Sequence, residues 1–126
     1  MPKFEKYLRL DPSGELRWIT IDRDRFLEDL YETIGTSSVE HVQLMHGLEC
    51  IVDELGYYHD HQRANLHASP LYAGWIRGVP LVGAVVFVRT GLDEYGDYDW
   101  FPLLPGHIRT LEHRLGVDIP DPDQED

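Results

Sequence analysis

The chain has 126 residues, of which 42% are hydrophobic and 27% are charged, a composition typical of one globular domain. Cys50 is the only cysteine, which excludes an internal disulfide and a multi-cysteine zinc cage. The formal net charge is -12, and residues 26–126 alone carry five basic against eighteen acidic side chains. Such an acidic surface repels phosphate backbones, which argues against direct DNA or RNA binding and favours a basic protein partner or plain solubility.

Membrane insertion is not expected from the sequence. The longest apolar run, residues 79–88, has ten residues and is too short to cross a bilayer as a helix. The first ten residues are charged and contain no apolar run of the kind that a signal peptide needs. We therefore expect a cytoplasmic protein in which Cys50 stays reduced.

A hairpin followed by a helix is predicted at the start of the chain. Short strand patterns flank the turn signal "DPSG" at residues 11–14. A helix is predicted over 24–34, with Asp24 as its cap and Gly35 at its end. The apolar residues at helical spacing are Phe26, Leu27, Leu30, Tyr31 and Ile34.

The middle of the chain predicts the strands of a sheet. Residues 39–52 alternate well enough for one or two strands, with Gly47 as a turn or bulge. The inward-facing candidates are Val42, Leu44, Leu48, Cys50 and Val52. A buried central strand is expected near 81–89, ending by Gly91. We expect the first helix to lie against it, in one core formed by Phe26, Leu30, Ile34, Val85 and Phe87.

The last third of the chain is acidic and rich in turns. Residues 92–106 predict a surface loop or edge segment, and residues 107–115 predict a short helix that ends at Gly116. Residues 118–126 contain two prolines and no periodicity, so we expect an acidic disordered tail after a domain that spans 1–117. Together these elements predict a compact α+β fold, with a mostly antiparallel sheet and two or three short helices.

Three histidines between residues 53 and 72 allow a metal site. His59 and His61 would lie on one face of a strand, with His67 or Asp60 as a third ligand. This spacing is not the i, i+4 spacing of the helical zinc signature. A polar loop is the competing interpretation, so the metal-binding or hydrolytic domain centred on these histidines is an alternative hypothesis.

The same stretch also allows a catalytic and a structural interpretation. Ser69 precedes a proline without the glycines of a nucleophile elbow, and Cys50 lies in an apolar strand pattern typical of an inert core thiol. No catalytic residue and no cofactor is therefore expected. In the structural interpretation, Asn65 caps a short helix that includes Ala68, and "DELG" at 53–56 forms a turn.

Turn and packing residues in this region resemble those of a known family. The strand ending in "VDELG", the segment "NLHASPLY" and the run "IRGVPLVGAVVFV" are similar to the family catalogued as domain of unknown function 3846. The matching positions are Glu54, Gly56, Asn65, Ala68 and Gly83. The resemblance spans residues 16–90 and implies an origin in phages, plasmids or bacterial genomes, with no established catalytic residue or cofactor to carry over.

The acidic aromatic segment "DEYGDYDWF" is the strongest lead for a partner. In an extended strand Asp97 and Asp99 would lie about 6.8 Å apart on one face, a distance comparable to that between neighbouring phosphates. We therefore predict a non-enzymatic interaction protein that binds a basic host protein, one that handles nucleic acid or serves in defence, in the manner of a DNA mimic. The predicted partner-binding residues are Asp93, Glu94, Tyr95, Asp97, Tyr98, Asp99 and Trp100. The competing interpretation is a solvated turn whose aromatic rings pack on the core.

Overall fold

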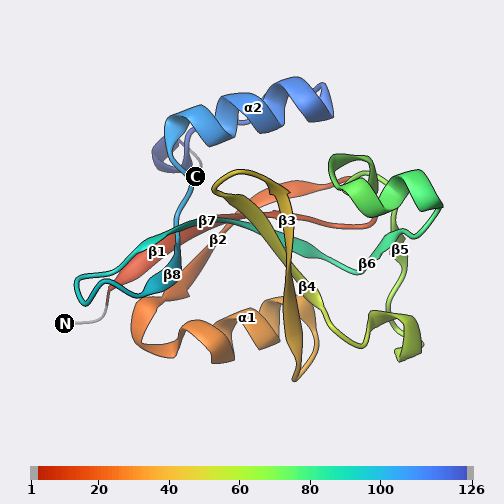
Figure 1. Cartoon of the computed structure of the whole chain (residues 1–126), viewed down its shortest axis with the longest axis horizontal. Helices are drawn as coiled ribbons and strands as arrows, with labels where there is room; N and C mark the ends of the chain where they lie inside the picture. Colours follow the sequence, from red (N-terminus) through yellow and green to blue (C-terminus); the bar gives the residue numbers. More distant parts are fainter. Residues whose placement is uncertain (1–2, 125–126) are drawn as a thin grey trace.

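A six-stranded antiparallel sheet forms the centre of the protein in the computed structural model, which describes residues 3–124 (Figure 1). Its strands are β1 (Phe4–Leu10), β2 (Leu16–Asp22), β3 (Val39–Met45), β4 (Leu48–Asp53), β7 (Val85–Leu92) and β8 (Tyr98–Phe101). A second, two-stranded sheet contains β5 (Ala64–Asn65) and β6 (Leu81–Val82). The helices are α1 (Phe26–Ile34), α2 (Pro105–Leu115) and the 3-10 helices η1 (Arg23–Arg25), η2 (Gly56–Tyr58), η3 (Ser69–Leu71), η4 (Ala73–Arg77) and η5 (Pro122–Gln124).

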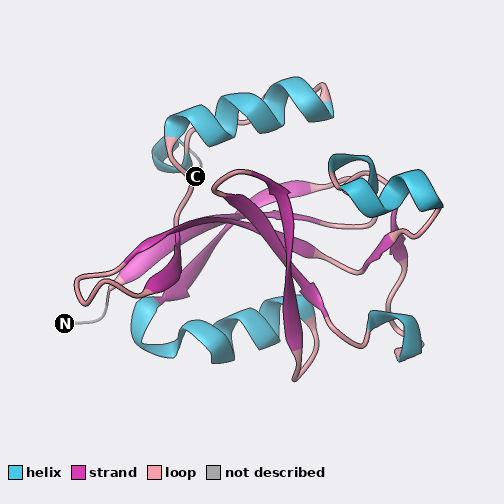
Figure 2. Ribbon diagram, in the orientation of Figure 1, coloured by secondary structure: helices cyan, strands magenta, loops and turns pink. Residues whose placement is uncertain are grey.

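The central strand β7 connects the two halves of the large sheet, whose order is β2-β1-β7-β4-β3. The first half of β7 pairs with β1 and β4, so that Phe87 lies opposite both Leu8 and Cys50. Its second half pairs with β8, which places Leu92 opposite Tyr98. The mostly antiparallel sheet with its two α-helices confirms the predicted α+β class and the opening hairpin (Figure 2).

Both faces of this sheet are covered, and each face has its own hydrophobic core (Figure 1). α1 packs on the face that carries Val86 and Val88, whereas α2 packs on the face that carries Val85 and Phe87. Successive side chains of a strand point to opposite faces, so one helix cannot contact all four. The prediction that Val85 and Phe87 share a core with the first helix is therefore wrong for its residues Phe26, Leu30 and Ile34.

The first helix begins and ends through local hydrogen bonds. The Asp22 carboxylate accepts the N–H of Asp24 and starts η1, which leads into α1, so the predicted cap at Asp24 is two residues too late. Gly35 ends α1 as predicted, in the left-handed conformation with φ of 81°. The predicted strand near 81–89 is also corrected, because Gly83, at φ of 86°, separates β6 from β7.

The C-terminal segment packs on the domain instead of forming a tail. Ile119 is buried in the α2-side core, and its N–H donates to the Glu112 carboxylate at 2.7 Å. The indole N–H of Trp18 donates to the Pro120 carbonyl at 2.8 Å. The prediction of a disordered tail from residue 118 is therefore wrong for this segment, while residues 125–126 lie outside the described part of the chain. No helix within residues 3–124 is long and apolar enough to cross a membrane.

Candidate functional site

All seven residues predicted to bind a partner lie on the hairpin that joins β7 to β8. Its tip, residues 93–97, is shaped by the Asp93 carboxylate. This group accepts the backbone N–H of Tyr95 at 2.8 Å and that of Asp97 at 2.9 Å. The Asp93 N–H also donates to the Asp97 carbonyl at 2.7 Å. The turn therefore holds its shape through local bonds and needs no contact from the rest of the fold.

The hairpin tip presents charge and aromatic surface to solvent. Tyr95 and Tyr98 are each 81% exposed, and Glu94 and Asp97 are exposed beside them. Among residues 3–124, no cation forms an ion pair with the carboxylates of Asp93, Glu94 or Asp97. Glu94 and Asp97 therefore present unpaired charges to solvent, whereas the half-buried Asp93 carboxylate adds negative charge while it bonds the turn.

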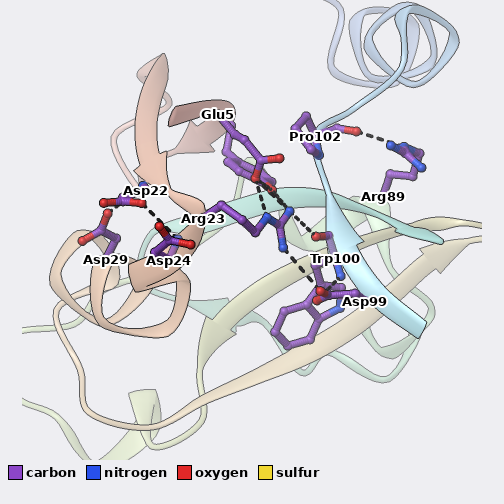
Figure 3. A network of polar contacts seen from close by, with 10 residues as sticks. Glu5, Asp22, Arg23, Asp24, Asp29, Arg89, Asp99, Trp100 and Pro102 are labelled. Atoms are coloured by element: carbon purple, nitrogen blue, oxygen red, sulfur yellow. Dashed lines mark hydrogen bonds and ion pairs between the residues drawn. The ribbon is translucent and has the colours of Figure 1, made fainter. Parts of the chain in front are cut away.

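The base of the hairpin is fastened to the fold by Arg23 (Figure 3). Its guanidinium donates to the Trp100 carbonyl at 2.7 Å and pairs with the Asp99 carboxylate at 3.4 Å. It also pairs with the Glu5 carboxylate of β1 at 2.7 Å and donates to the Tyr7 hydroxyl at 3.0 Å. One arginine thus bridges β8 to the first hairpin, across the region where β1 no longer pairs with β7.

This network changes the roles of two predicted residues. The charge of Asp99 is balanced by Arg23, so Asp97 and Asp99 do not form the expected pair of free charges that would imitate neighbouring phosphates. The Trp100 ring lies 6.1 Å from that of Phe26 and 5.9 Å from that of His41. Trp100 is therefore partly a packing residue of the α1-side core, and only part of its surface is open to a partner.

A groove of about 510 Å³ lies beside the hairpin and contains the open part of Trp100. Its lining residues come from β3, β4, β7 and β8 and are His41, Glu49, Thr90, Tyr98, Asp99 and Trp100. The Glu49 carboxylate accepts the indole N–H of Trp100 at 3.3 Å and lies 3.0 Å from Nδ1 of His41. The groove therefore combines the Glu49 carboxylate with the rings of Trp100 and Tyr98.

Sequence reasoning missed His41 and Glu49 as members of this site. The available signal was the turn at Gly47, because a hairpin there pairs His41 with Ile51 and places Glu49 diagonally across from His41 on the same face. The long-range partner, Trp100, comes from a strand 51 residues away from Glu49 along the chain. That pairing is not visible in the local pattern.

The histidine stretch folds differently from its prediction. His59 and His61 lie in a loop after η2 and not on a strand, and their rings stack with centroids 5.3 Å apart. The residue that joins them is Asp53, whose Oδ2 lies 2.6 Å from Nδ1 of His59. His67 lies elsewhere, against Gly14 in the first hairpin, so a site centred on all three histidines is corrected to one of Asp53, His59 and His61.

The loop also holds the end of α1. The Gln62 side-chain amide donates to the Ile34 carbonyl at 3.1 Å and to the Asp53 carboxylate at 2.9 Å. Nε2 of His61 lies 2.9 Å from the Gly35 carbonyl. Burial alone would raise the pKa of Asp53, but the hydrogen bonds from Gln62, His59 and neighbouring groups outweigh it and hold that pKa below its usual value. We call Asp53, His59, His61 and Gln62 the Asp53 cluster.

The two nucleophile candidates are structural. Burial raises the pKa of the Cys50 thiol to about 12, which leaves the thiol protonated in the α2-side core. The buried Ser69 hydroxyl donates to the Asn65 carbonyl at 2.6 Å and accepts the Leu81 N–H at 2.8 Å. The Asn65 side chain accepts the Ala68 N–H at 3.0 Å and so closes the turn before η3. The predicted helix cap is corrected, because the cap residue of η3 is Ala68, which forms no side-chain cap bond.

Comparison of the chain with protein-family models, curated proteins and solved structures gave no match. The resemblance to domain of unknown function 3846 stays a prediction. The residues that carry it have backbone roles here: Asn65 closes the turn at Ala68, and a side chain at Gly83 would meet the Gln62 amide at 2.7 Å. Such residues specify a chain path and identify no reaction.

Proposed function

We propose that this protein is a non-enzymatic acidic interaction module, which binds a basic segment of a partner protein in the groove beside the β7–β8 hairpin. The observation that carries the proposal is the Glu49 carboxylate, which accepts the Trp100 indole N–H at 3.3 Å inside a groove of about 510 Å³. An arginine or lysine side chain is the ligand that fits this chemistry. It can form charge-assisted hydrogen bonds to a carboxylate while its cation lies over an aromatic ring.

The protein already contains an example of this mode of binding. Arg23 pairs with the Asp99 carboxylate, and its guanidinium lies 4.8 Å from the Phe26 ring centroid and 5.1 Å from that of Phe101. A partner arginine in the groove would meet the other side of the same strand, where Trp100 and Tyr98 supply the rings. The Glu49 side chain is only 14% exposed, so that a cation bound there would be shielded from water.

The hairpin tip supports the approach of such a partner. Its three acids lack an ion pair with any residue between 3 and 124, and they lie next to two tyrosines that are each 81% exposed. Residues 26–126 carry a formal charge of -13, from five basic and eighteen acidic side chains, so the attraction extends beyond the groove itself. Charges at the rim of a site mainly raise the association rate, and tyrosines add contact area at a small entropic cost.

Nucleic-acid-handling and defence proteins of a host are the class of partner that presents such basic surfaces. The resemblance to a family carried by phages and plasmids agrees with an origin in a mobile element. The mimicry we propose rests on the total charge of the hairpin tip and groove and not on phosphate-like spacing, because Asp99 is paired with Arg23.

Binding of a fluorescent peptide that alternates arginine with serine tests the proposal directly. Fluorescence anisotropy would be measured at about 0.05 and about 0.5 M salt, where the screening lengths are about 14 and about 4 Å. We expect saturable binding that weakens at the higher salt. An otherwise identical peptide with glutamine in place of arginine should not bind.

Two variants separate the groove from general charge. The groove variant Glu49→Gln with Trp100→Phe should lose at least about tenfold in affinity, because it removes one carboxylate and the best ring for a cation. The tip variant Asp93→Asn, Glu94→Gln and Asp97→Asn should lose affinity mainly through its association rate. The control variant Asp24→Asn, Glu28→Gln and Asp118→Asn removes three exposed charges elsewhere. Equal losses in the tip and control variants, with none in the groove variant, would contradict the proposal.

A further inference from the structure

The Asp53 cluster brings together three metal-ligating side chains from two segments of the chain. One ligand atom from each of Asp53, His59 and His61 lies within 4.8 Å of the other two. Asp53 ends β4, and both histidines lie in the loop that follows η2. The Asp53 side chain is fully buried, that of His59 is 29% exposed, and His61 is exposed. The donors therefore form a site with a buried floor and one open side.

A bound cation would balance the buried negative charge of the Asp53 carboxylate. Within residues 3–124, no lysine or arginine pairs with the Asp53 carboxylate, whose one ion-pair partner there is His59. Buried carboxylates normally have a cationic partner or bind a metal. The site also lies at the C-terminal end of α1, where the carbonyls of Ile34 and Gly35 point toward Gln62 and His61. The helix dipole favours positive charge at this end.

Two of the three ligands, Asp53 and His61, are held in place by further hydrogen bonds. The Asp53 carboxylate accepts the Leu55 N–H at 2.9 Å through Oδ1 and the Gln62 amide at 2.9 Å through Oδ2. The His61 ring is oriented by the Gly35 carbonyl, 2.9 Å from its Nε2. Hydrogen bonds of this kind from carbonyls and amides to metal ligands fix ring orientation and raise metal affinity.

We propose that Asp53, His59 and His61 bind one divalent transition-metal ion of the Zn²⁺ class. Two imidazoles with one carboxylate suit Zn²⁺ and its neighbours in the first transition row and do not suit Ca²⁺ or Mg²⁺, which select oxygen ligands. Bonds of about 2.0–2.1 Å in a tetrahedral site separate two ligand atoms by about 3.3 Å. Oδ2 of Asp53 and Nδ1 of His59, now 2.6 Å apart and joined by a proton, would separate by about 0.7 Å as the ion replaces that proton. The exposed side at His61 leaves a fourth position to water.

This inference is independent of the proposed interaction function. The metal site uses the end of β4 and its following loop, whereas the peptide groove uses Glu49 nearer the start of β4 together with β3 and β8. Failure of one experiment therefore leaves the other unaffected. The metal would fix the loop onto α1 and would not contact the hairpin.

Calorimetric titration of the chelator-treated full chain with zinc chloride tests the site. We expect one ion per chain and saturable binding. His61→Ala should weaken binding at least about a hundredfold, since loss of a supporting hydrogen bond alone costs 10–100-fold. This variant should fold, because the His61 side chain is exposed. Gln62→Ala should weaken binding by about 10–100-fold, as expected for a residue that orients a ligand.

His46→Ala and His67→Ala are the matched controls, because each removes one exposed imidazole outside the site. Both should bind zinc like the wild-type protein. Zinc should also raise the melting temperature of the wild type and of both controls but not that of His61→Ala. Absence of saturable binding, or equal affinity in His61→Ala and His67→Ala, would overturn the proposal. The Asp53 cluster would then serve only to hold its loop against the end of α1.

Discussion

The Asp53 cluster and the hairpin tip are both polar loops that follow a buried strand, yet the fold uses them in opposite ways. In the Asp53 cluster, the side chains of His61 and Gln62 bond groups that lie 26 and 28 residues away along the chain. At the tip, the Asp93 carboxylate bonds only the N–H groups of Tyr95 and Asp97. One loop is tied to the rest of the fold, and the other holds itself and turns its remaining side chains outward.

Both loops are polar, so polarity alone does not distinguish them. What distinguishes a structural loop from a surface that is free to bind is whether its polar side chains already have partners within the fold. The buried Asp53 carboxylate is bonded by the Leu55 N–H, the Gln62 amide and the His59 ring. Glu94 lies in an exposed turn and forms no ion pair with a cation of residues 3–124. The predictions below test this contrast.

The largest expected effect is on the strand that supports both regions. Phe87 is fully buried and pairs with β1 and β4, so Phe87→Ala should lower the free energy of unfolding by about 3–5 kcal/mol. Urea unfolding measured by circular dichroism gives this value. A midpoint equal to that of the wild type would mean that β7 is not the centre of the sheet.

The second prediction compares the two carboxylates that shape the loops. Asp53→Ala leaves buried donors without an acceptor and should cost about 2–4 kcal/mol of unfolding free energy. Asp93→Ala should cost less than about 1 kcal/mol, because water can replace its bonds at the exposed tip. Chemical unfolding of both variants side by side gives the difference. Equal losses would break the comparison between the two loops.

Residues 117–121 form a third acidic segment, which differs from the hairpin tip because it includes a buried residue, Ile119. Ile119 is only 3% exposed, so Ile119→Ala should cost about 2–3 kcal/mol, at the lower end for large-to-small core substitutions. Thermal unfolding of this variant and of Val117→Ala, whose side chain is 42% exposed, provides a matched pair. A melting temperature that is the same in both variants would restore the prediction of an undocked tail.

The smallest expected change in stability belongs to the hairpin tip. Asp93→Asn with Glu94→Gln and Asp97→Asn keeps the shape of each side chain and the oxygen that accepts the turn bonds. The free energy of unfolding should therefore change by less than about 0.5 kcal/mol. A loss of several kcal/mol in a denaturant titration would show that these acids serve the fold and not a partner.

Local patterns in the sequence were sufficient for the hairpin, both α-helices and the fold class. They failed where the answer depends on which surfaces meet. The run 84–88 is apolar throughout because both faces of β7 are covered. It therefore contains no alternation of apolar and polar residues that would show which helix packs against Val85 and which against Val86. Ile119 is a single apolar residue among prolines and acids, and its burial depends on packing against residues of distant elements.

The candidate sites show the same limit. The seven residues predicted to bind a partner do lie on one hairpin, but sequence reasoning could not foresee that Arg23 would pair with Asp99. Sequence reasoning also grouped His59 and His61 with His67 because all three are histidines of one short stretch. The fold instead supplies Asp53, from the end of the preceding strand, as the third ligand. Long-range pairs of this kind follow from sheet order, which the local periodicity does not contain.

The most direct test of the central claim is a nuclear magnetic resonance titration of the isotope-labelled chain with the arginine-serine peptide. The indole N–H of Trp100, which donates to Glu49, provides a signal inside the groove itself. We predict that this signal and the backbone amides of residues 93–100 shift in a saturable manner, while those of residues 53–62 stay unchanged. Shifts confined to residues 53–62, or a Trp100 indole signal that does not move, would contradict the claim that the protein binds basic partners through the groove beside its hairpin.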